Sequence, residues 1–404
     1  MSGPTRVAVL VASLAGAWPS SAAPVQVGLD VLVEKAGHPL VGRHIGVVAH
    51  AASVGADGRH ILAVLRDLGV DVRRVFAPEH GLDSLAAPGE PIRDRIENVS
   101  GVPVVSLYGA KLAPSMVDLS DLDALVFDLQ GAGVRFYTYV STLVLCLEAA
   151  AEADIEFVVL DRPNPLGGEL VAGPHVDPAK RRSFLALAPG PLIHGLTAGE
   201  MALFLTAGRV GSPSVRVVPM RDWRRAMTWS DTQRAWVPPS PNLRTPEAAL
   251  AYPGVALLEA TNVSEGRGTE APFLLIGAPW LDPEPLRARL ERTGFAAETA
   301  TFTPARGHPG AAPKYGGVEI LGLRIRARAP RSVHPYALGL TLLSALQGQT
   351  GFRWRSETAL DDLLGTARVR EQLSRGSSIS AILASDADAI AAYREKRKPF
   401  LLYE

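Results

Sequence analysis

The sequence lacks the cysteines and the charge imbalance that mark several protein classes. Of its 404 residues one is a cysteine, Cys146, so an intrachain disulfide is excluded. The apolar stretch around Cys146 predicts a residue in the core of a helix. Lys plus Arg and Asp plus Glu number 41 each, and we find no run of like charges. Because nucleic-acid binding needs a clustered basic surface, no nucleic-acid partner is expected.

Several catalytic motifs are also missing. No G-x-G-x-x-G follows the first predicted strand, so a dinucleotide cofactor is not supported. No G-x-S-x-G elbow occurs, which counts against an esterase or amidase. The histidines His44, His50 and His60 are spaced apart, and neither H-E-x-x-H nor a cysteine cluster is present. We therefore expect no cofactor and no metal site.

The N-terminus reads as a signal peptide over residues 1–23. Arg6 precedes the apolar run "VAVLVASLAGAW", and small residues at Ser21 and Ala23 occupy the positions that a signal peptidase reads. The alternative is a buried first strand of a cytoplasmic protein. The run is too short to span a bilayer, and no other segment is suited to do so, so stable membrane insertion is not expected. The leader predicts a secreted or periplasmic protein.

What the sequence does contain is an alternation of short apolar runs and helical stretches over residues 24–180. Strands are predicted in "HIGVVAH", "VRRVFAPEH", "VPVVSLYG", "DALVFDLQ" and "IEFVVLDRPNP", and helices over residues 58–70 and 139–154. Continuous apolar strands that alternate with helices predict an α/β fold with a Rossmann-like, doubly wound parallel sheet. From about Ser183 proline and glycine become frequent, which predicts a second, smaller α+β domain over residues 181–404.

Polar residues follow four of the predicted strands. Ligands of a doubly wound sheet bind beyond the carboxyl ends of its strands, so polar groups that gather there favour a binding site. A single such residue is more often a loop anchor. The residues at these ends are His50, Glu79 with His80, Asp128, and Asp161 with Asn164.

Two further stretches are rich in polar and aromatic groups. In "GVRFYTYVSTL", Arg135, Tyr137 and Tyr139 precede a helix, and tyrosines suit a sugar face or a carboxylate as well as simple packing. In "LLEATNVSEGRGTEAPF" the candidates are Asn262, Glu265 and Arg267. Glycines flank Arg267 and would let the backbone approach a ligand. Asn242, which follows the proline run in "WVPPSPNL", joins them as a loop residue that can present a hydrogen-bonding side chain.

The motifs "PEHG", "RFYTY", "DRPNPLGG" and "EGRGT" occur in this order, and together they resemble the exo-β-N-acetylmuramidase family. The resemblance runs from about Val27 to Tyr403. It implies a Rossmann-like domain, a smaller second domain and an active site in the cleft between them. It also implies release of N-acetylmuramic acid from the non-reducing ends of β-1,4-linked peptidoglycan fragments, so the expected partners are peptidoglycan-derived saccharides.

The resemblance also suggests which residues act. It makes Glu79 the leading catalytic candidate, and we infer that Glu265 or Tyr139 would assist from the opposite side. His80 or Asp128 would tune the acid, and Arg135 or Arg267 would pair with the lactyl carboxylate of muramic acid. The positions that match family motifs are His80, Arg135, Tyr137, Tyr139, Asp161, Asn164, Asn262, Glu265 and Arg267.

The chain departs from the family pattern at the rim of the expected site. Many relatives carry an Asn-Gln or Asn-His pair where "AHAAS" stands here, an acidic residue at the position of Gly131, and Arg-Gly in place of "LDS" after "PEHG". These changes motivate an alternative function, a non-catalytic protein that binds cell-wall sugars in the same cleft. The separation of two carboxyl groups that distinguishes retaining from inverting hydrolysis is not readable from sequence.

Overall fold

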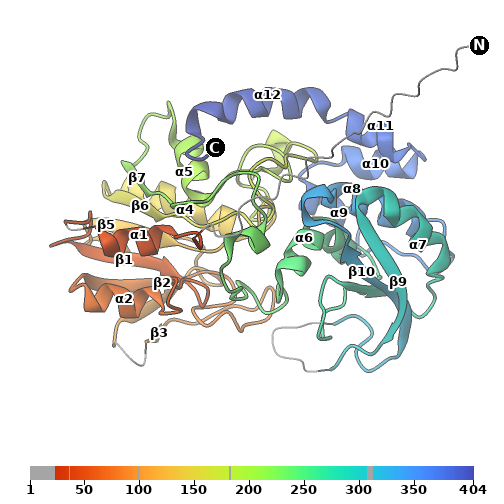
Figure 1. Cartoon of the computed structure of the whole chain (residues 1–404), viewed down its shortest axis with the longest axis horizontal. Coiled ribbons are helices and arrows are strands. Elements are labelled where there is room, and N and C mark those ends of the chain that lie inside the picture. The colour runs from red at the N-terminus through yellow and green to blue at the C-terminus, as the bar shows by residue number, and fades with distance from the viewer. Residues whose placement is uncertain (1–22, 36, 98–100, 182, 307–312) are drawn as a thin grey trace, which may run out of the picture.

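A computed structural model describes residues 23–35, 37–97, 101–181, 183–306 and 313–404. Two domains lie side by side in Figure 1, with the larger sheet on the left and a smaller antiparallel sheet on the right. Both the α/β fold class and the presence of a second, smaller domain are thereby confirmed. The predicted signal peptide lies outside the described residues except for Ala23. Among the helices of the described residues, none has the length and apolar character needed to cross a bilayer.

The first domain is built on a sheet of seven strands in the order β3-β4-β2-β1-β5-β6-β7. Six of them run parallel, and β3 pairs antiparallel with β4. The chain moves outward from β1 to β2 and β4, and then returns to β5 on the other side of β1, so the topological switch point lies between β1 and β5. The strands are β1 (His44–Ala49), β2 (Asp71–Ala77), β3 (Arg95–Ile96), β4 (Pro103–Ser106), β5 (Ala124–Asp128), β6 (Glu156–Leu160) and β7 (Val215–Val218).

Strand β5 shows why its apolar residues are continuous. Ala124 and Val126 belong to the hydrophobic cluster on one face of the sheet, and Leu125 and Phe127 to the cluster on the other. Successive side chains of a strand alternate between faces, so a sheet covered on both sides needs apolar residues at every position. The covering helices are α1 (Gly28–Glu34) and α2 (Ile61–Asp67) on one face, and α4 (Tyr139–Glu152) and α5 (Ala198–Thr206) on the other, with the short α3 (Met116–Leu119) before β5.

The first domain continues past the boundary that the sequence suggests near residue 180. Strand β7 pairs in parallel with β6 from Phe157 and Val215 onward, and α5 packs on the same sheet. Part of the glycine- and proline-rich sequence that begins near Ser183 therefore forms the loops that lead to α5 and β7. These loops belong to the first domain and not to the second.

The second domain holds three antiparallel strands in the order β8-β10-β9, covered by helices. Strand β10 pairs with β9 over its whole length and with β8 over three residues. Helix α8 packs on α6 and α7 and belongs to the main hydrophobic cluster. The elements are α6 (Pro246–Val255), β8 (Leu275–Gly277), α7 (Glu284–Leu290), β9 (Phe295–Phe302), β10 (Ile320–Ala327), α8 (Pro335–Leu346), α9 (Ala359–Leu364), α10 (Arg368–Ser374), α11 (Ile379–Ala384) and α12 (Ala387–Arg397).

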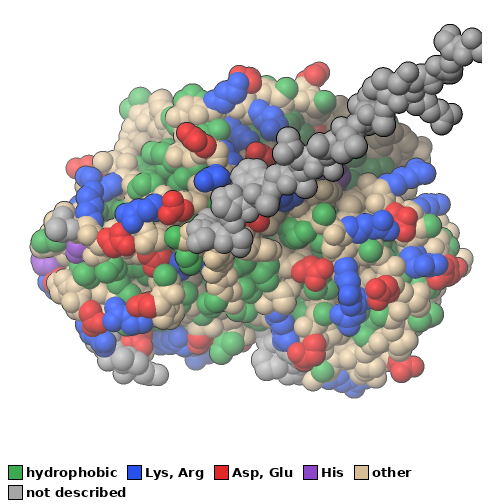
Figure 2. Space-filling model, in the orientation of Figure 1, with side chains coloured by type: hydrophobic (Ala, Val, Ile, Leu, Met, Phe, Trp, Pro, Cys, Tyr) green, Lys and Arg blue, Asp and Glu red, His purple; other side chains and the backbone are tan. Residues whose placement is uncertain are grey.

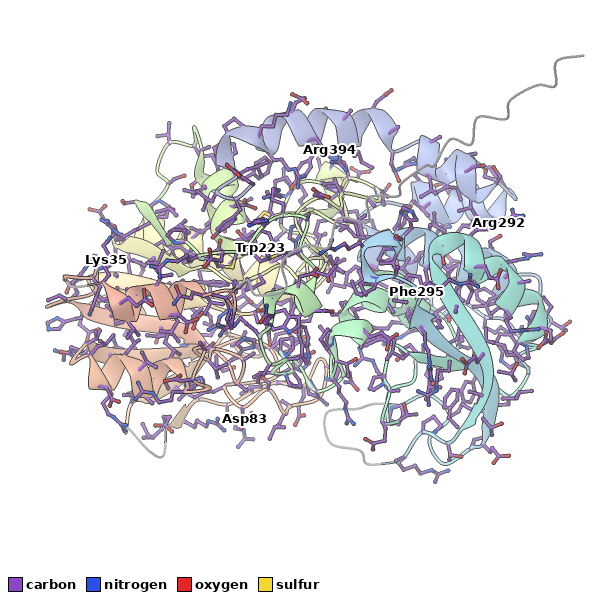
Figure 3. The ribbon with its side chains drawn as sticks, viewed as in Figure 1. Lys35, Asp83, Trp223, Arg292, Phe295 and Arg394 are labelled. Atoms are coloured by element: carbon purple, nitrogen blue, oxygen red, sulfur yellow. The ribbon has the colours of Figure 1, made fainter. Side chains whose placement is uncertain are left out.

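The last residues return from the second domain to the first. Helix α12 runs along the top of Figure 1 towards α5, and Arg397 at its end donates to the carbonyl oxygens of His194 and Gly195. Tyr403 stacks edge-on against Trp223, labelled in Figure 3, with ring centres 5.0 Å apart. The hydroxyl of Tyr403 donates to the buried carboxylate of Asp161 over 2.6 Å. The two domains are thus joined both by the chain that leads into α6 and by this returning tail.

Candidate active site

Strand β2 delivers Glu79 to the edge of the sheet. Its last three residues are buried, and after Pro78 the chain turns sharply, with the amide of Gly81 donating to the carbonyl oxygen of Pro78. His80 and Gly81 both have positive φ angles, 73° and 80°. Histidine tolerates this left-handed region better than bulky or β-branched residues, and glycine adopts it freely. The motif "PEHG" therefore encodes a tight turn that fixes the glutamate at the strand end.

Within the described residues, the carboxylate of Glu79 accepts hydrogen bonds from uncharged groups. The amide of Gly89 donates to Oε1 over 2.9 Å, and the hydroxyl of Thr138 donates to Oε2 over 2.6 Å. Burial first, then the charge of Glu79 and a hydrogen bond to it, raise the pKa of Tyr108 to about 12. Glu79 forms no ion pair among the residues that the structure describes, and the residue is 8% exposed.

His80 of the first domain lies within electrostatic reach of Arg267 of the second domain. The Nδ1 of His80 lies 2.8 Å from the carbonyl oxygen of Ala86, to which it donates. Burial lowers the pKa of His80, the neighbouring Glu79 opposes this effect, and the positive charge of Arg267 adds to it. His80 is therefore a neutral residue that shapes the turn, and Arg267 of the second domain is close enough to act on it.

Tyr139 and His50 hold a loop of the later chain against the sheet edge. The hydroxyl of Tyr139 lies 2.7 Å from the carbonyl oxygen of Pro239 and 3.2 Å from that of Glu79. His50, fully buried, directs Nδ1 to the same Pro239 oxygen at 3.3 Å, and its Nε2 accepts from the amide of Gln130. Burial, and then Arg162, lower the pKa of His50 well below its ordinary value. Both side chains are thus committed to protein groups behind Glu79.

A series of aromatic rings connects the two candidate carboxylates. Tyr139 and Tyr137 have ring centres 4.7 Å apart, Tyr137 and Tyr252 5.9 Å, and Tyr252 and Phe273 4.7 Å, all in edge-on geometry. The guanidinium of Arg267 lies 5.1 Å from the centre of the Phe273 ring. Such edge-to-face contacts fix ring orientation as well as burying area. They set the relative position of Glu79 and the "EGRGT" segment.

Glu265 is surrounded by cations, unlike Glu79. Arg267 Nε lies 3.1 Å from its Oε1, and Lys314 Nζ lies 2.9 Å from its Oε2. Lys314 also donates to the carbonyl oxygens of Leu258 and Val263, and Arg267 pairs with Glu259 over 2.6 Å. With a side chain 3% exposed, Glu265 is the centre of a buried ionic network in which its charge is stabilised.

Two of the predicted acids bond instead to groups of the scaffold. Asp161 accepts from Thr197, from the amide of Gly199 and from Tyr403, and burial raises its pKa to about 6. Asp128 forms a two-point ion pair with Arg162, buried on both sides. These contacts engage both carboxylates with protein groups other than Glu79.

Asn164, Asn262 and Arg135 also bond to backbone groups of the protein and so have a structural role. Asn164 bonds to the backbone of Leu166 and Leu196, and Asn262 bonds to the backbone of Gly351 and Arg353. Arg135 is 1% exposed and donates to the carbonyl oxygen of Leu364; burial lowers its pKa to about 10. Asn242 is buried three residues beyond Pro239. The structure thus assembles Glu79, His80, Tyr137, Tyr139, His50, Glu265 and Arg267, and leaves Asp161, Asn164, Asn262 and Arg135 as supports.

Sequence reasoning missed three residues that shape the site. Thr138 and Tyr108 lie in the motifs "RFYTY" and "PVVSLYG", and both contact Glu79. Lys314 directly precedes "YGGVEI" and contacts Glu265. The sequence shows a lysine next to one motif and a threonine between two tyrosines of another. Only the fold shows that these residues contact the two glutamates. No group of three His, Cys, Asp or Glu in the described parts of the chain is placed to hold a metal ion.

The fold and the site define a two-domain α/β protein with a candidate acid–base site between its domains. The first, doubly wound domain provides a carboxylate that is bound by neutral donors at a strand end, and the second domain provides an ionic network. Comparison with known proteins narrows this class. The N-terminal domain of the family described as "Exo-beta-N-acetylmuramidase NamZ" matches residues 45–247, and its C-terminal domain matches residues 250–403. The chain belongs to this family of glycoside hydrolases.

Individual relatives agree with this assignment. The peptidoglycan β-N-acetylmuramidase NamZ of Bacillus subtilis (strain 168) is 34% identical over 385 residues, which cover 94% of this chain and 91% of the relative. Two crystal structures of DUF1343 family proteins from Bacteroides fragilis (NCTC 9343) superpose with TM-scores of 0.82 and 0.75 at 26% and 27% identity. Each match covers 94% of this chain and 99% of the other.

Proposed function

We propose that this protein removes N-acetylmuramic acid from the non-reducing ends of β-1,4-linked peptidoglycan fragments, with Glu79 as the general acid. The observation that carries the assignment is the setting of Glu79, a carboxylate 8% exposed whose hydrogen-bond partners are uncharged donors. Glycosidic cleavage requires a carboxyl group that gives a proton to the leaving oxygen. Glu79 is the better candidate because its oxygens are bound by neutral donors, whereas both oxygens of Glu265 are held by cations.

Glu265 acts differently in this proposal. Its two oxygens are held by Lys314 and Arg267, so both are engaged in ion pairs. It orients Arg267, whose positive charge reaches His80 beside Glu79. We assign to Arg267, rather than to Arg135, the contact with the lactyl carboxylate of the substrate. Arg135 is 1% exposed and points to Leu364, whereas Arg267 is 9% exposed and lies towards the first domain.

The test uses the disaccharide N-acetylmuramyl-β-1,4-N-acetylglucosamine as substrate, and chromatography measures the N-acetylmuramic acid that is released. Wild type is expected to split it, and Glu79→Gln to lose most of the activity. Glu90→Gln is the matched control, because Glu90 is exposed in the same loop and bonds to the amide of Ala87. Equal turnover by wild type and Glu79→Gln would remove Glu79 from the mechanism. Saturable binding without any cleavage by wild type would instead support the sugar-binding alternative.

Export through the N-terminal leader is part of the same proposal. The support is the apolar run that follows Arg6 and the small residues before Pro24, together with a polymer substrate that lies outside the cytoplasmic membrane. Cell fractionation and N-terminal sequencing of the mature chain test it. A mature protein that begins at Pro24 is expected. An intact Met1 on protein confined to the cytoplasm would contradict export without bearing on the chemistry.

A further inference from the structure

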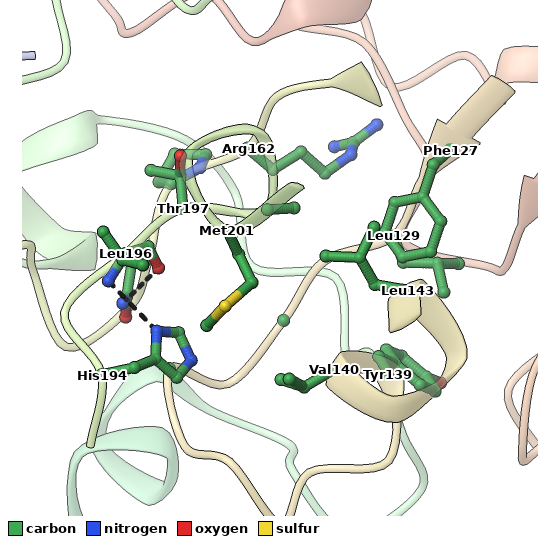
Figure 4. A pocket seen from close by; sticks show the side chains of 15 residues that line it. Phe127, Leu129, Tyr139, Val140, Leu143, Arg162, His194, Leu196, Thr197 and Met201 are labelled. Carbon is green, nitrogen blue, oxygen red and sulfur yellow. Dashed lines mark hydrogen bonds between the residues drawn. The ribbon is translucent and has the colours of Figure 1, made fainter. Parts of the chain in front are cut away.

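A small cavity lies behind Tyr139 at the carboxyl ends of β5 and β6. Its volume is about 50 Å³, and Figure 4 shows the side chains around it. The walls are mainly apolar and come from β5, α4, α5 and the segment before α5. They include Phe127, Leu129, Val140, Leu143, Leu196 and Met201. Tyr139 belongs both to this wall and to the Glu79 site, because its hydroxyl contacts the Glu79 carbonyl oxygen.

One polar group of this wall is unused within the described residues. His194 is 5% exposed, and its Nε2 is buried without a hydrogen-bond partner in the part of the chain that the structure describes. The Nδ1 of His194 accepts from the amide of Leu196 over 3.1 Å, so the ring proton lies on Nε2, which is a donor. Figure 4 shows the ring beside the Met201 side chain.

The charges around His194 fix both its state and the kind of ligand it suits. Burial first, and then the positive charges of Arg397 and Arg135, lower the pKa of His194 to about 3, so the ring stays neutral. Those two cations also favour the negative end of a dipole near the ring. A carboxylate would need several donors when buried, and this wall offers one free side-chain donor among the described residues. A single carbonyl oxygen is the better match.

The size of the cavity points to the same group. A cavity of about 150 Å³ in another protein holds benzene, with six carbon atoms. About a third of that volume corresponds to two heavy atoms, such as the methyl carbon and the carbonyl oxygen at the end of an acetyl group. At the rim, a Cβ atom added to Gly131 would meet no atom within 4 Å, so the chain leaves space on this side of the cavity.

We propose that this cavity is a subsite for the N-acetyl group of the substrate sugar. The carbonyl oxygen accepts from His194 Nε2, and the methyl group packs against Met201 and Leu143. The inference rests on the proposed function, since it concerns the sugar that the Glu79 site would hold. It makes His194 and Met201 residues that determine specificity for the acyl substituent, and it assigns them no part in proton transfer.

Calorimetric binding of two free sugars, N-acetylmuramic acid and its N-propanoyl analogue, tests the subsite without any turnover. Wild type is expected to prefer the N-acetyl sugar. Met201→Ala enlarges the wall, so the N-propanoyl sugar should gain about fourfold or more relative to the N-acetyl sugar, as one buried methylene implies. Met220→Ala is the matched control, because Met220 is a buried methionine of a separate cluster. An unchanged preference in Met201→Ala, equal to that of the control, would overturn the subsite.

Two variants of His194 test the hydrogen bond. His194→Leu should weaken binding of N-acetylmuramic acid roughly tenfold, which corresponds to one lost hydrogen bond. His194→Gln, whose amide can both accept from Leu196 and donate into the cavity, should recover much of the loss. Equal binding by both variants would exclude the donor role. Wild type that shows the acyl preference but never cleaves the disaccharide would refute the proposed function and leave the subsite standing.

Discussion

Glu79 and Glu265 are both buried glutamates in family motifs, but they have opposite surroundings. Glu79 is held by an amide and a hydroxyl, with a phenol also facing it, whereas Glu265 is held by an ammonium and a guanidinium. In the proposed mechanism the carboxyl group held by neutral donors is the general acid. The carboxylate between two cations is the centre of an ionic network that orders its neighbours. The comparison teaches that two buried glutamates of family motifs can differ in their partners, and the proposed roles of the two residues rest on that difference.

The largest expected effect is the loss of catalysis in Glu79→Gln. The glutamine can keep both hydrogen bonds of the carboxylate, because its oxygen accepts from Gly89 and its amide donates to the Thr138 hydroxyl. The fold should survive while kcat falls about 10²- to 10⁴-fold, the usual contribution of a general acid. Steady-state hydrolysis of the disaccharide, with circular dichroism as the folding control, measures both. A fall below tenfold would place the acid elsewhere.

Glu265→Gln should show the reverse pattern, a loss of stability first. Removing this charge leaves Lys314 and Arg267, with side chains 24% and 11% exposed, without their shared anion. Breaking a buried ion pair from one side lowers the free energy of unfolding by about 3–5 kcal/mol. Urea unfolding of Glu265→Gln beside Glu79→Gln measures the contrast. Equal stability of the two variants would erase the distinction drawn between the two carboxylates.

Asp161 is a third case to set beside the two glutamates. Like Glu79 it is buried among neutral donors, but its donors belong to the structural framework rather than to the candidate site. Its pKa is raised to about 6 by burial, against about 3.9 in an unfolded chain. Between these values the folded state binds the proton and the unfolded state does not, so stability falls as pH rises from about 4 to about 6. Over that range wild type should lose about 2–3 kcal/mol of unfolding free energy relative to Asp161→Asn. Parallel pH profiles of the two proteins would refute the assignment.

The smallest expected effect comes from Thr138→Val, which removes one donor from Glu79 while keeping the shape of the side chain. Loss of one hydrogen bond to a carboxylate in the site should lower kcat/KM about three- to tenfold. Thr142→Val is the control on the same helix, because the Thr142 hydroxyl donates to the carbonyl oxygen of Thr138 rather than to Glu79. If both variants lose activity equally, the effect belongs to the helix and not to Glu79.

The sheet and the position of Glu79 could be predicted because they depend on local patterns. Continuous apolar runs fix a covered parallel sheet, and a Pro-Glu-His-Gly turn after one of them fixes a side chain at the strand end. The role of Asp161 could not be predicted, because its donors come from Thr197 and Gly199 and from Tyr403, which lies 242 residues further along the chain. The extent of the first domain could not be predicted for a similar reason. The sequence of β7 does not indicate which sheet the strand joins, and only its pairing with β6 assigns it to the first domain.

The returning tail has a consequence for biosynthesis. The amide of Leu402 donates to Glu200, and the amide of Arg225 donates to the carbonyl oxygen of Glu404, so the last residues of the chain complete the core of the domain made first. While the ribosome is still translating residues 250–390, that domain has every strand of its sheet but lacks Tyr403, which is one of the donors to Asp161 and the ring that packs on Trp223. The first domain should therefore reach its full stability only when the final residues of the chain are in place.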